Sequence, residues 1–535
     1  MPNLTINGQS VTVDPGTSVL QAARSAGIEV PHFCWHPYLT VAGNCRMCLV
    51  EIEKQPKLAI SCATPAAEGM VARFDTEKVK DAVQGVLEFE LVNHPIDCPI
   101  CDQAGECYLQ DYYMEVGLHD SRIDREDKVG KGKTIDLGPI VLDQERCVLC
   151  SRCVRYTTEI SKTGELYIFD RGDRCEIRTF ADRPLTGEYT GNLADVCPVG
   201  ALTSRDFRFK KRVWFLKPTA SVCQGCATGC SIWVDWEKTT VYRLRPRDNP
   251  HVNKLWMCDP GRATYRAIGS PDRAVKPEIR ETGSGLTTVA WERAIKAAAE
   301  ALAEGPVGVM LPASLSLEDM AAGSVLLEVL GCGEPACWLV PEQDDPAASL
   351  DGILRKADPF PNTNGAALSG LIPHEGGRGR TVALVDALRS GAIKTVLVAS
   401  AQDLARGETG ASLLAELSRI PNRIVLASHA GPWRDAATVF LPQATWAERE
   451  GTTINGDGRL QRYRKAIDPP GGARAAFEIF LAILGAMGHP RKETTAREIF
   501  RFIASEVPRL HGITYERIGQ LGIAVPAEAP VAAPA

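Results

Sequence analysis

The stretch Cys147-Val-Leu-Cys150-Ser-Arg-Cys153 places three cysteines at intervals of two residues in a chain of 535 residues. A Cys-x2-Cys-x2-Cys run is typical of ferredoxin-like folds in which four thiolates hold a 4Fe-4S cluster. A remote Cys-Pro often supplies the fourth thiolate, so Cys197-Pro198 is the favoured candidate and Cys175 competes with it. We therefore expect a 4Fe-4S ferredoxin-like domain over residues 138–215.

A second ligand set precedes this stretch and contains one histidine. His94, Cys98, Cys101 and Cys107 follow the spacing His-x3-Cys-x2-Cys-x5-Cys. A site with four donors can take an imidazole in place of one thiolate, so we interpret His94 as a ligand. We expect a 4Fe-4S cluster within residues 79–119. A Cys₃His zinc site has the same composition and stays open as an alternative.

A third group of cysteines lies nearer the N-terminus, and it follows the spacing Cys-x10-Cys-x2-Cys-x13-Cys. One long loop would wrap the inorganic core of a cluster there, and the surrounding fold favours 2Fe-2S. A structural zinc site is the alternative. We call this group the first set, because it comes first in the chain. Its members are Cys34, Cys45, Cys48 and Cys62.

The residues around the first set predict a β-grasp ferredoxin domain over residues 1–78. Leu4–Ile6 and Val11–Val13 alternate like strands, and Asn7-Gly8 between them suits a tight hairpin. A helix is expected from Val19, capped by the preceding Thr or Ser. Further short strands follow, and a hairpin, a helix and then more strands is the order of this fold.

The fourth set lies downstream, within residues 216–272. Its spacing is Cys-x2-Cys-x3-Cys-x27-Cys, which again suits a 4Fe-4S cluster, with a zinc ribbon as the alternative. The two remaining cysteines, Cys332 and Cys337, have no partners nearby and are expected to be inert. The members of the fourth set are Cys223, Cys226, Cys230 and Cys258.

The sequence pattern changes in the remainder of the chain, where predicted strands alternate with predicted helices from about residue 290. Such alternation predicts a layered α/β domain with parallel strands, here over residues 273–520. The Pro/Ala-rich residues 521–535 are expected to be a disordered tail. The expected strands are Val307–Leu311, Thr395–Ala399 and Arg423–Ala427, and the expected helices are Trp291–Ala303 and Leu317–Leu330.

Composition excludes several classes of protein. A net charge of −6 argues against nucleic-acid binding, which normally needs a basic face. No apolar run has the length of a membrane span, and the N-terminus lacks the pattern of a signal peptide, so we expect a protein that stays in the cytoplasm. Sixteen of the 18 cysteines precede residue 260 in this long chain, which favours metal binding over disulfides.

Nucleotide sites are not expected on this chain. Gly331-x-Gly333-x-x-Ala336 matches a dinucleotide fingerprint by its letters, but it follows a helix and Pro335 interrupts it. Gly132-Lys133-Thr134 lacks the first glycine of a phosphate-binding loop, because Asp127 stands in its place. We expect no catalytic residue and no independent NADH or quinone site.

The four sets, in this order, resemble the large iron–sulfur subunit of respiratory complex I, the NADH:quinone oxidoreductase. The strings Asn93-His94-Pro95 through Cys107 and Cys197-Pro198-Val199-Gly200-Ala201-Leu202 are similar to that family. The C-terminal half resembles molybdopterin oxidoreductases through Glu450-Gly451-Thr452, Asn455 and Gly458-Arg459. The fold expected from the resemblance is therefore multidomain, α+β followed by α/β.

The resemblance implies one 2Fe-2S cluster, three 4Fe-4S clusters and no molybdopterin. Molybdenum enzymes usually carry a basic residue shortly after the last cluster cysteine, and Pro260 stands there in this chain. The implied partners are a flavin-bearing NADH-oxidising subunit and other peripheral-arm subunits, on the cytoplasmic side of the cell membrane without a span of its own. The fourth cluster would lie off the main electron route.

Three other functions stay open at this point. One is a molybdenum-dependent formate dehydrogenase, which shares the N-terminal modules. The second is the electron-transfer subunit of an NAD-linked hydrogenase, which usually lacks a long C-terminal half. The third, of another class, is an interaction protein held together by zinc.

Overall fold

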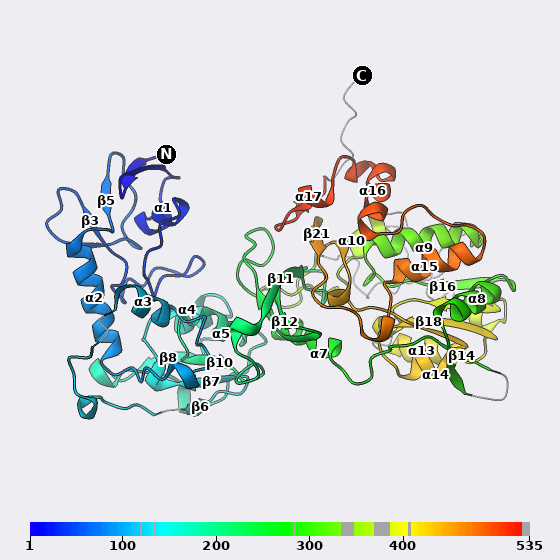
Figure 1. Ribbon diagram of the computed structural model, residues 1–535, viewed down its shortest axis with the longest axis horizontal. Coiled ribbons are helices and arrows are strands. Elements are labelled where there is room, and N and C mark those ends of the chain that lie inside the picture. The colour runs from blue at the N-terminus through cyan, green and yellow to red at the C-terminus, as the bar shows by residue number, and fades with distance from the viewer. Residues whose placement is uncertain are drawn as a thin grey trace, which may run out of the picture. The chain divides into compact units, whose positions relative to one another are not determined.

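The computed structural model describes residues 1–117, 120–132, 134–281, 285–332, 347–368, 386–404 and 408–526. Cys337, Lys133, most of the dinucleotide-like stretch and residues 527–535 of the expected tail lie outside them. The chain divides into two compact units, Met1–Leu216 and Lys217–Ala535. Figure 1 shows the elements of each unit, coloured from blue to red along the chain.

The N-terminal part of the first unit is the expected β-grasp fold. Its sheet has the order β2-β1-β5-β3-β4, and β1 pairs parallel with β5 while its hairpin partner β2 runs antiparallel. Ser18 caps α1 through a capping box with Gln21, as its position before the apolar run predicts. The elements are β1 (Asn3–Ile6), β2 (Gln9–Thr12), α1 (Val19–Ser25), β3 (Leu49–Ile52), β4 (Ala59–Ile60) and β5 (Val71–Arg73).

Two helices follow and flank the second ligand set. Helix α2 (Glu77–Leu91) begins at the cap Thr76 and buries Val79, Val83 and Leu87 along one face. Helix α3 (Tyr108–Val116) begins directly after Cys107. The residues between the helices form loops and one short 3-10 turn, so the ligand loop is held at its ends by regular structure.

The rest of the first unit is a small α+β arrangement around the third set. Strand β7 lies between β6 and β10 and pairs antiparallel with both. A separate antiparallel ribbon is formed by β8 and β9. The elements are β6 (Thr134–Asp136), β7 (Ile140–Asp143), α4 (Arg152–Glu159), β8 (Leu166–Phe169), β9 (Glu176–Thr179), α5 (Asn192–Val196) and β10 (Leu202–Ser204).

The second unit begins with an antiparallel three-stranded sheet, β11-β12-β13, and two short helices. A second small sheet, β20-β21-β22, includes residues 523–524, which therefore pair with β21 although the composition predicts a disordered tail from residue 521. The elements are β11 (Lys217–Val222), β12 (Ser231–Glu237), β13 (Thr240–Pro246), α6 (Asp259–Ala263), α7 (Tyr265–Ile268), β20 (Gly451–Ile454), β21 (Arg459–Tyr463) and β22 (Ile523–Ala524).

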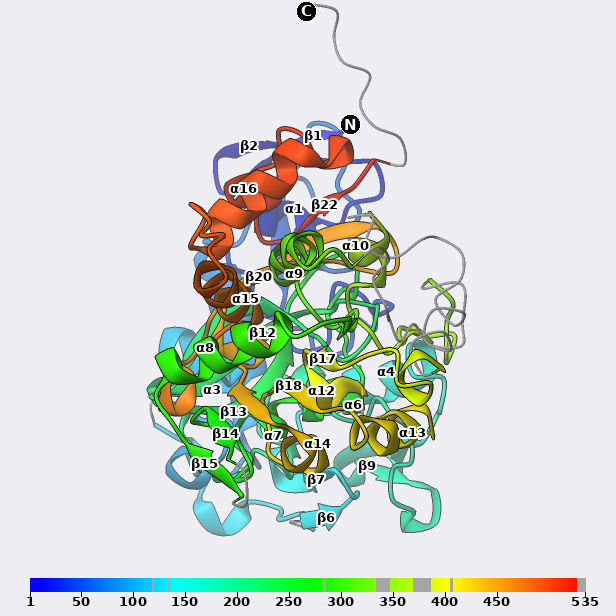
Figure 2. The same cartoon turned by 90° about the vertical axis from the view of Figure 1, so that its right-hand side faces the viewer.

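The expected α/β domain is a six-stranded sheet of order β15-β14-β19-β18-β17-β16, with β16 to β19 parallel. Alternate residues of one strand face opposite sides, so Leu397 joins one core and Val396 the other. Figure 2 shows α8, α9 and α15 on one side and α12, α13 and α14 on the other. The strands are β14 (Glu278–Arg280), β15 (Leu286–Thr288), β16 (Val307–Met310), β17 (Thr395–Val398), β18 (Asn422–Ala427) and β19 (Val439–Pro442).

The two helices that the sequence predicts in this domain are both present, as α8 and α9. Ser316 caps α9 through a capping box, as expected. The helices are α8 (Trp291–Leu302), α9 (Leu317–Val329), α10 (Thr363–Leu368), α12 (Ala401–Leu404), α13 (Glu408–Leu417), α14 (Pro432–Ala436), α15 (Ala476–Ala486), α16 (Ala496–Glu506) and α17 (Tyr515–Ile518).

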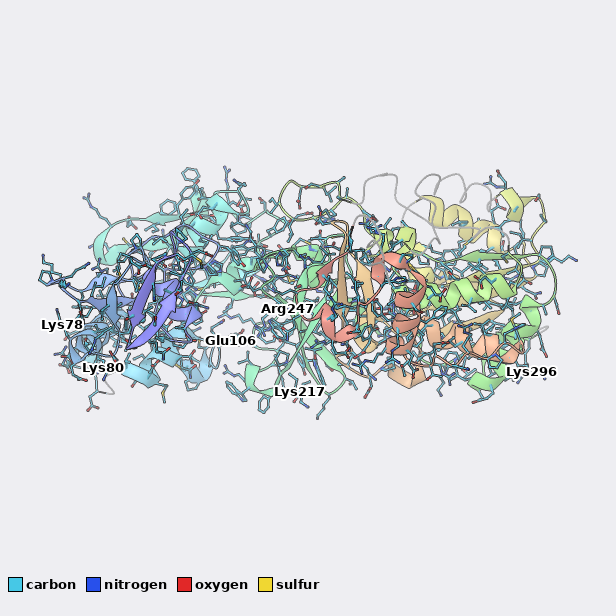
Figure 3. The ribbon with its side chains drawn as sticks, turned by 90° about the horizontal axis from the view of Figure 1, so that it is seen from above. Lys78, Lys80, Glu106, Lys217, Arg247 and Lys296 are labelled. Atoms are coloured by element: carbon cyan, nitrogen blue, oxygen red, sulfur yellow. The ribbon has the colours of Figure 1, made fainter. Side chains whose placement is uncertain are left out.

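Charged side chains cover the outside of both units. Lys80 and Lys296 project from their helices (Figure 3), and each forms an exposed ion pair with a glutamate on the same helix. Such exposed pairs contribute little to stability. Within the described ranges, every helix is too short or too polar to cross a bilayer.

Candidate metal centres

The four cysteines of the first set converge inside the β-grasp domain. The thiol of Cys34 lies within hydrogen-bond distance of Cys45 and Cys62, and Cys62 also contacts Cys48. All four side chains are buried. The contact with Cys62 lowers the pKa of the Cys48 thiol to about 7. The structure therefore gathers four sulfur donors, but not from the single long loop that was expected: three lie on the loop before β3, and Cys62 follows β4.

The loop of the first set turns its backbone N–H groups toward sulfur. Asn44 and Cys45 donate their N–H groups to the Cys34 sulfur, and Phe33 donates to the Cys45 sulfur at 3.5 Å. Left-handed backbone at Gly43 (φ 65°) and Arg46 (φ 60°) makes the tight turns that this wrapping requires. Hydrogen bonds to ligand sulfurs are one means by which a protein tunes an iron–sulfur cluster.

The four residues of the second set line one pocket beside α3, which contains His94, Cys98, Cys101 and Cys107. Burial lowers the pKa of His94 to about 4, so the imidazole is neutral at pH 7 and has a lone pair for a metal. Burial raises the pKa of Cys107 to about 11, so a metal would have to displace its proton.

Gly200, which comes from a distant part of the chain, closes this pocket. A Cβ atom at Gly200 would lie 2.4 Å from the Cys101 sulfur and 3.1 Å from the Cβ of Gln103. Only glycine leaves room for the thiol in this position. The sequence contained a signal for this residue, because it belongs to the string that starts at Cys197, but a role next to Cys101 was not predicted.

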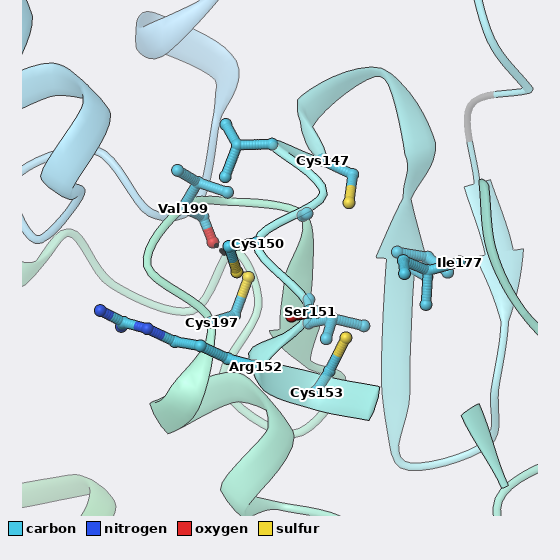
Figure 4. A pocket seen from close by; sticks show the side chains of 12 residues that line it. Cys147, Cys150, Ser151, Arg152, Cys153, Ile177, Cys197 and Val199 are labelled. Atoms are coloured by element: carbon cyan, nitrogen blue, oxygen red, sulfur yellow. Dashed lines mark hydrogen bonds between the residues drawn. The ribbon is translucent and has the colours of Figure 1, made fainter. Parts of the chain in front are cut away.

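The third set lines a small cavity with apolar walls formed by Leu142, Ile177 and Val199. Figure 4 shows the thiols of Cys150 and Cys197 next to each other, with those of Cys147 and Cys153 at either end. The competing Cys175 does not line this cavity, and its thiol faces the carbonyl oxygen of Asp170 at 3.8 Å. The structure thus brings together the four cysteines that the sequence favoured.

The loop between Cys147 and Cys153 is strained in a way that suits ligand binding. Leu149 (φ 47°) and Ser151 (φ 61°) adopt the left-handed conformation that non-glycine residues rarely take. The N–H of Leu149 points at the Cys147 sulfur, 3.4 Å away. Such strain is characteristic of functional sites. Burial raises the pKa of Cys147 to about 12.

The fourth set belongs to the second unit, and its members come from the turn of a hairpin and from the start of a helix. Cys223, Cys226 and Cys230 lie between β11 and β12, and Cys258 caps α6. A Cβ atom at Gly261 would lie 3.1 Å from the Cys258 sulfur and 3.3 Å from the Cys223 sulfur, so these two thiols approach each other across the glycine.

The donor chemistry of all four sets fits iron–sulfur clusters. Thiolates and, less often, imidazoles are the protein ligands that hold such clusters. The loops provide sulfur donors, N–H groups directed at sulfur and glycines next to it.

Direct contacts connect the first and third sets within the first unit. The guanidinium of Arg155 on α4 donates to the carbonyl oxygens of Cys34 and Cys150, and Asn44 donates its side-chain N–H to the Leu149 carbonyl at 3.2 Å. The ligand loops of the first and third sets therefore pack against each other, which the sequence alone did not reveal.

A buried ion pair adds to these contacts. Arg146, next to Cys147, forms an ion pair with Asp97, next to Cys98, at 2.6 Å, and it also approaches Asp143 at 3.3 Å. Its charge is therefore balanced by two carboxylates, and the pair holds the loop of the second set against that of the third.

The carboxyl ends of the parallel strands are where folds of this kind bind their ligands, so a molybdopterin would be expected there. At this edge the N–H of Ser400 donates to the Gln443 side-chain oxygen at 3.0 Å, and the Gln443 amide donates to the Ser400 hydroxyl at 2.8 Å. Ser314 donates to Asp403 at 2.7 Å. These polar side chains are thus bonded to one another.

Family models match the first unit in three places. They are described as a 2Fe-2S iron–sulfur cluster binding domain (residues 2–77), an NADH-ubiquinone oxidoreductase-G iron–sulfur binding region (residues 84–122) and a ferredoxin-like domain of NADH-quinone oxidoreductase subunit 3 (residues 138–203). The curated relatives agree: the G-type subunit of NADH-quinone oxidoreductase from Rickettsia bellii is 41% identical over 336 residues, which are 62% of this chain and 49% of that protein.

The chain is a homologue of the G-type subunit of NADH-quinone oxidoreductase. This confirms the resemblance inferred from the ligand sets. Eukaryotic relatives also match: the mitochondrial NADH dehydrogenase iron–sulfur protein 1 of Solanum tuberosum is 41% identical over 337 residues, 62% of this chain and 45% of that protein. The NADH-ubiquinone oxidoreductase 75 kDa subunit of Reclinomonas americana is 44% identical over 295 residues, 55% of this chain and 42% of that protein.

This homologue spans about half the length of the curated relatives it matches. Its second unit matches the molybdopterin oxidoreductase Fe4S4 domain (residues 216–270) and the molybdopterin oxidoreductase family (residues 374–486). These matches confirm the expected fold class. A solved NAD+-reducing [NiFe]-hydrogenase in its H2-reduced state is 30% identical and covers 40% of this chain and 91% of its own, but the TM-score is only 0.37.

Proposed function

We propose that this chain is an electron-transfer subunit of an NADH:quinone oxidoreductase. In this role it takes electrons from a flavin-bearing, NADH-oxidising partner and passes them toward quinone-reducing subunits. The observation that carries the proposal is that three ligand sets, two with four cysteines and one with a histidine and three cysteines, each bring their donors together within the first unit. Iron–sulfur clusters supply one-electron transfer when they are bound, and the protein contributes ligands, burial and spacing.

The proposed ligands are the sixteen residues of the four sets. The first set would hold a 2Fe-2S cluster and the other three would hold 4Fe-4S clusters. The proposal includes no molybdopterin, because Pro260 follows Cys258 on α6 and the polar groups at the carboxyl ends of the parallel strands bond to one another. The proposed location is the cytoplasmic side of the cell membrane, in a complex with the other peripheral-arm subunits. The fourth cluster is proposed to lie off the main route.

Metal analysis tests the proposed cofactors directly. We expect about 14 iron atoms per chain with an equal amount of sulfide after anaerobic purification, as one 2Fe-2S and three 4Fe-4S clusters require. Elemental analysis and sulfide determination give these numbers, and EPR of the reduced protein identifies the cluster types. Stoichiometric zinc with little sulfide would contradict the proposal, and near-stoichiometric molybdenum would favour the formate dehydrogenase alternative.

Replacing His94 by cysteine tests the histidine ligand. The neutral imidazole of His94 would be exchanged for an anionic thiolate, which adds negative charge to the cluster and disfavours its reduced state. We expect His94→Cys to keep its cluster and to lower the midpoint potential of that cluster alone. A redox titration followed by EPR measures the change. His429→Cys, a change at the partly exposed histidine after β18, is the control. An unchanged titration of His94→Cys would show that His94 is not a ligand.

A further inference from the structure

Arg152 is a buried cation beside the third ligand set. It is the first residue of α4, directly before Cys153, and its side chain is 4% exposed. It lines the same cavity as the four cysteines, and Figure 4 shows its side chain leaving that cavity beside Cys150 and Cys197.

The guanidinium of Arg152 contacts the neighbours of three ligands. Its Nη2 donates to the carbonyl oxygen of Trp35 at 2.6 Å, and its Nη1 donates to that of Val196 at 3.3 Å. The guanidinium carbon lies 5.4 Å from the centre of the Tyr108 ring, which is a cation–π distance. Each contact therefore reaches a different ligand loop. The ligands adjacent to these residues in the sequence are Cys34, Cys197 and Cys107.

The charge of Arg152 is not balanced by a carboxylate among the described residues. Across the described ranges, no Asp or Glu lies within ion-pair distance of Arg152, and its buried Nε has no hydrogen-bond acceptor. The other buried arginine of the described first unit, Arg146, pairs with both Asp97 and Asp143. Carbonyl oxygens and an aromatic ring satisfy part of a guanidinium but do not neutralise it, and an uncompensated buried charge is costly.

The cysteines of the third set are groups that could balance this charge. Cys150 and Cys197 line the same cavity as Arg152, and Arg152 donates to the carbonyl oxygen of Val196, the residue before Cys197. Four thiolates around one cluster give the site a net negative charge, which a nearby guanidinium would stabilise.

We propose that Arg152 is the counter-charge of the third ligand set, a positioning and charge-balancing residue that favours the reduced state of the cluster bound there. This inference rests on the proposed function, specifically on a 4Fe-4S cluster at Cys147, Cys150, Cys153 and Cys197. Reduction adds one electron to the site, so a buried cation beside it makes reduction easier. Because Arg152 also contacts Trp35 and Tyr108, we expect its loss to change the reduction potentials of the first and second clusters as well, but by less.

The test is a redox titration of the cluster-loaded protein, followed by EPR. In Arg152→Gln and Arg152→Met, we expect the equilibrium constant for one-electron reduction of the third cluster to fall at least tenfold, which is about 59 mV. In Arg152→Lys, which keeps the charge, the reduction potential of the third cluster should stay close to that of the parent protein. Arg205→Gln is the control, because it removes an exposed arginine paired with Asp136. Iron content is measured for every variant.

Each outcome is informative. A fully loaded neutral variant with an unchanged third-cluster potential would overturn the inference. If both neutral variants lose the third cluster while Arg152→Lys keeps it, the charge is needed for cluster assembly, which supports the inference. If Arg152→Lys loses the cluster as well, the shape of the guanidinium matters rather than its charge, and the inference is wrong. Absence of this cluster from the parent protein would instead refute the proposed function on which the inference rests.

Discussion

Replacing Gly200 by alanine is expected to remove the cluster of the second ligand set and to leave the other three in place. The new methyl group would lie 2.4 Å from the Cys101 sulfur, far inside van der Waals contact. The sulfur can avoid it only by rotating away from the pocket that it shares with His94 and Cys107. Gln103 restricts the movement further, because its Cβ would lie 3.1 Å from the same methyl group.

Iron analysis and EPR measure this loss. The iron content should fall by about 4 atoms per chain, and the signal of the histidine-ligated cluster should disappear. Gly85→Ala is the matched control: Gly85 lies within α2, and a Cβ there would meet no atom within 4 Å. That variant should keep all its iron and gain slightly in stability, since alanine is the better helix former. Full iron content in Gly200→Ala would show that Cys101 ligates in another position.

NADH is expected to reduce the cluster-loaded chain only when a flavoprotein partner is present. NADH donates two electrons together as a hydride, whereas each cluster accepts one electron. A flavin is therefore needed to accept the electron pair and to pass the electrons on one at a time. Stopped-flow absorbance should show rapid reduction with the partner and no reduction above the buffer control without it. Dithionite, which donates single electrons, should reduce the isolated chain and so prove that its clusters are intact. Rapid reduction by NADH of the isolated chain would show that it has its own nicotinamide and flavin chemistry.

The segment from His94 to Gly117 is our candidate docking site for that partner. Ile100 and Met114 are 65% and 69% exposed there, beside the pocket of the second set. Exposed apolar side chains of this size are common at protein interfaces. A glutamate at either position should slow reduction by the partner without changing reduction by dithionite. Leu350→Glu, at an exposed residue of the second unit, is the control and should have no effect.

Local sequence was sufficient for much of this protein. Gaps of two to five residues between ligands place several donors of each set on one short loop, so these members could be named without the fold. Helix α9 is a comparable case, because Ser316 and Asp319 form a capping box from neighbouring residues. The alternating helices and strands of the second unit were predictable because a buried parallel strand is apolar throughout. Strand β22, which lies in the expected disordered tail, could not be predicted in this way, because its pairing with β21 joins residues more than fifty positions apart.

The sequence by itself therefore predicted four ligand sets, with Cys197 and Cys175 competing for one place, and it established the likeness to the large iron–sulfur subunit of complex I. Only the tertiary structure decided that Cys197 rather than Cys175 lines the cavity of the third set. It also decided that Gly200 packs against Cys101 and that Arg152 is buried with no carboxylate partner among the described residues. The physical reason is that short loops fix contacts between neighbours, whereas packing, burial and charge balance depend on residues that meet only after the whole chain has folded.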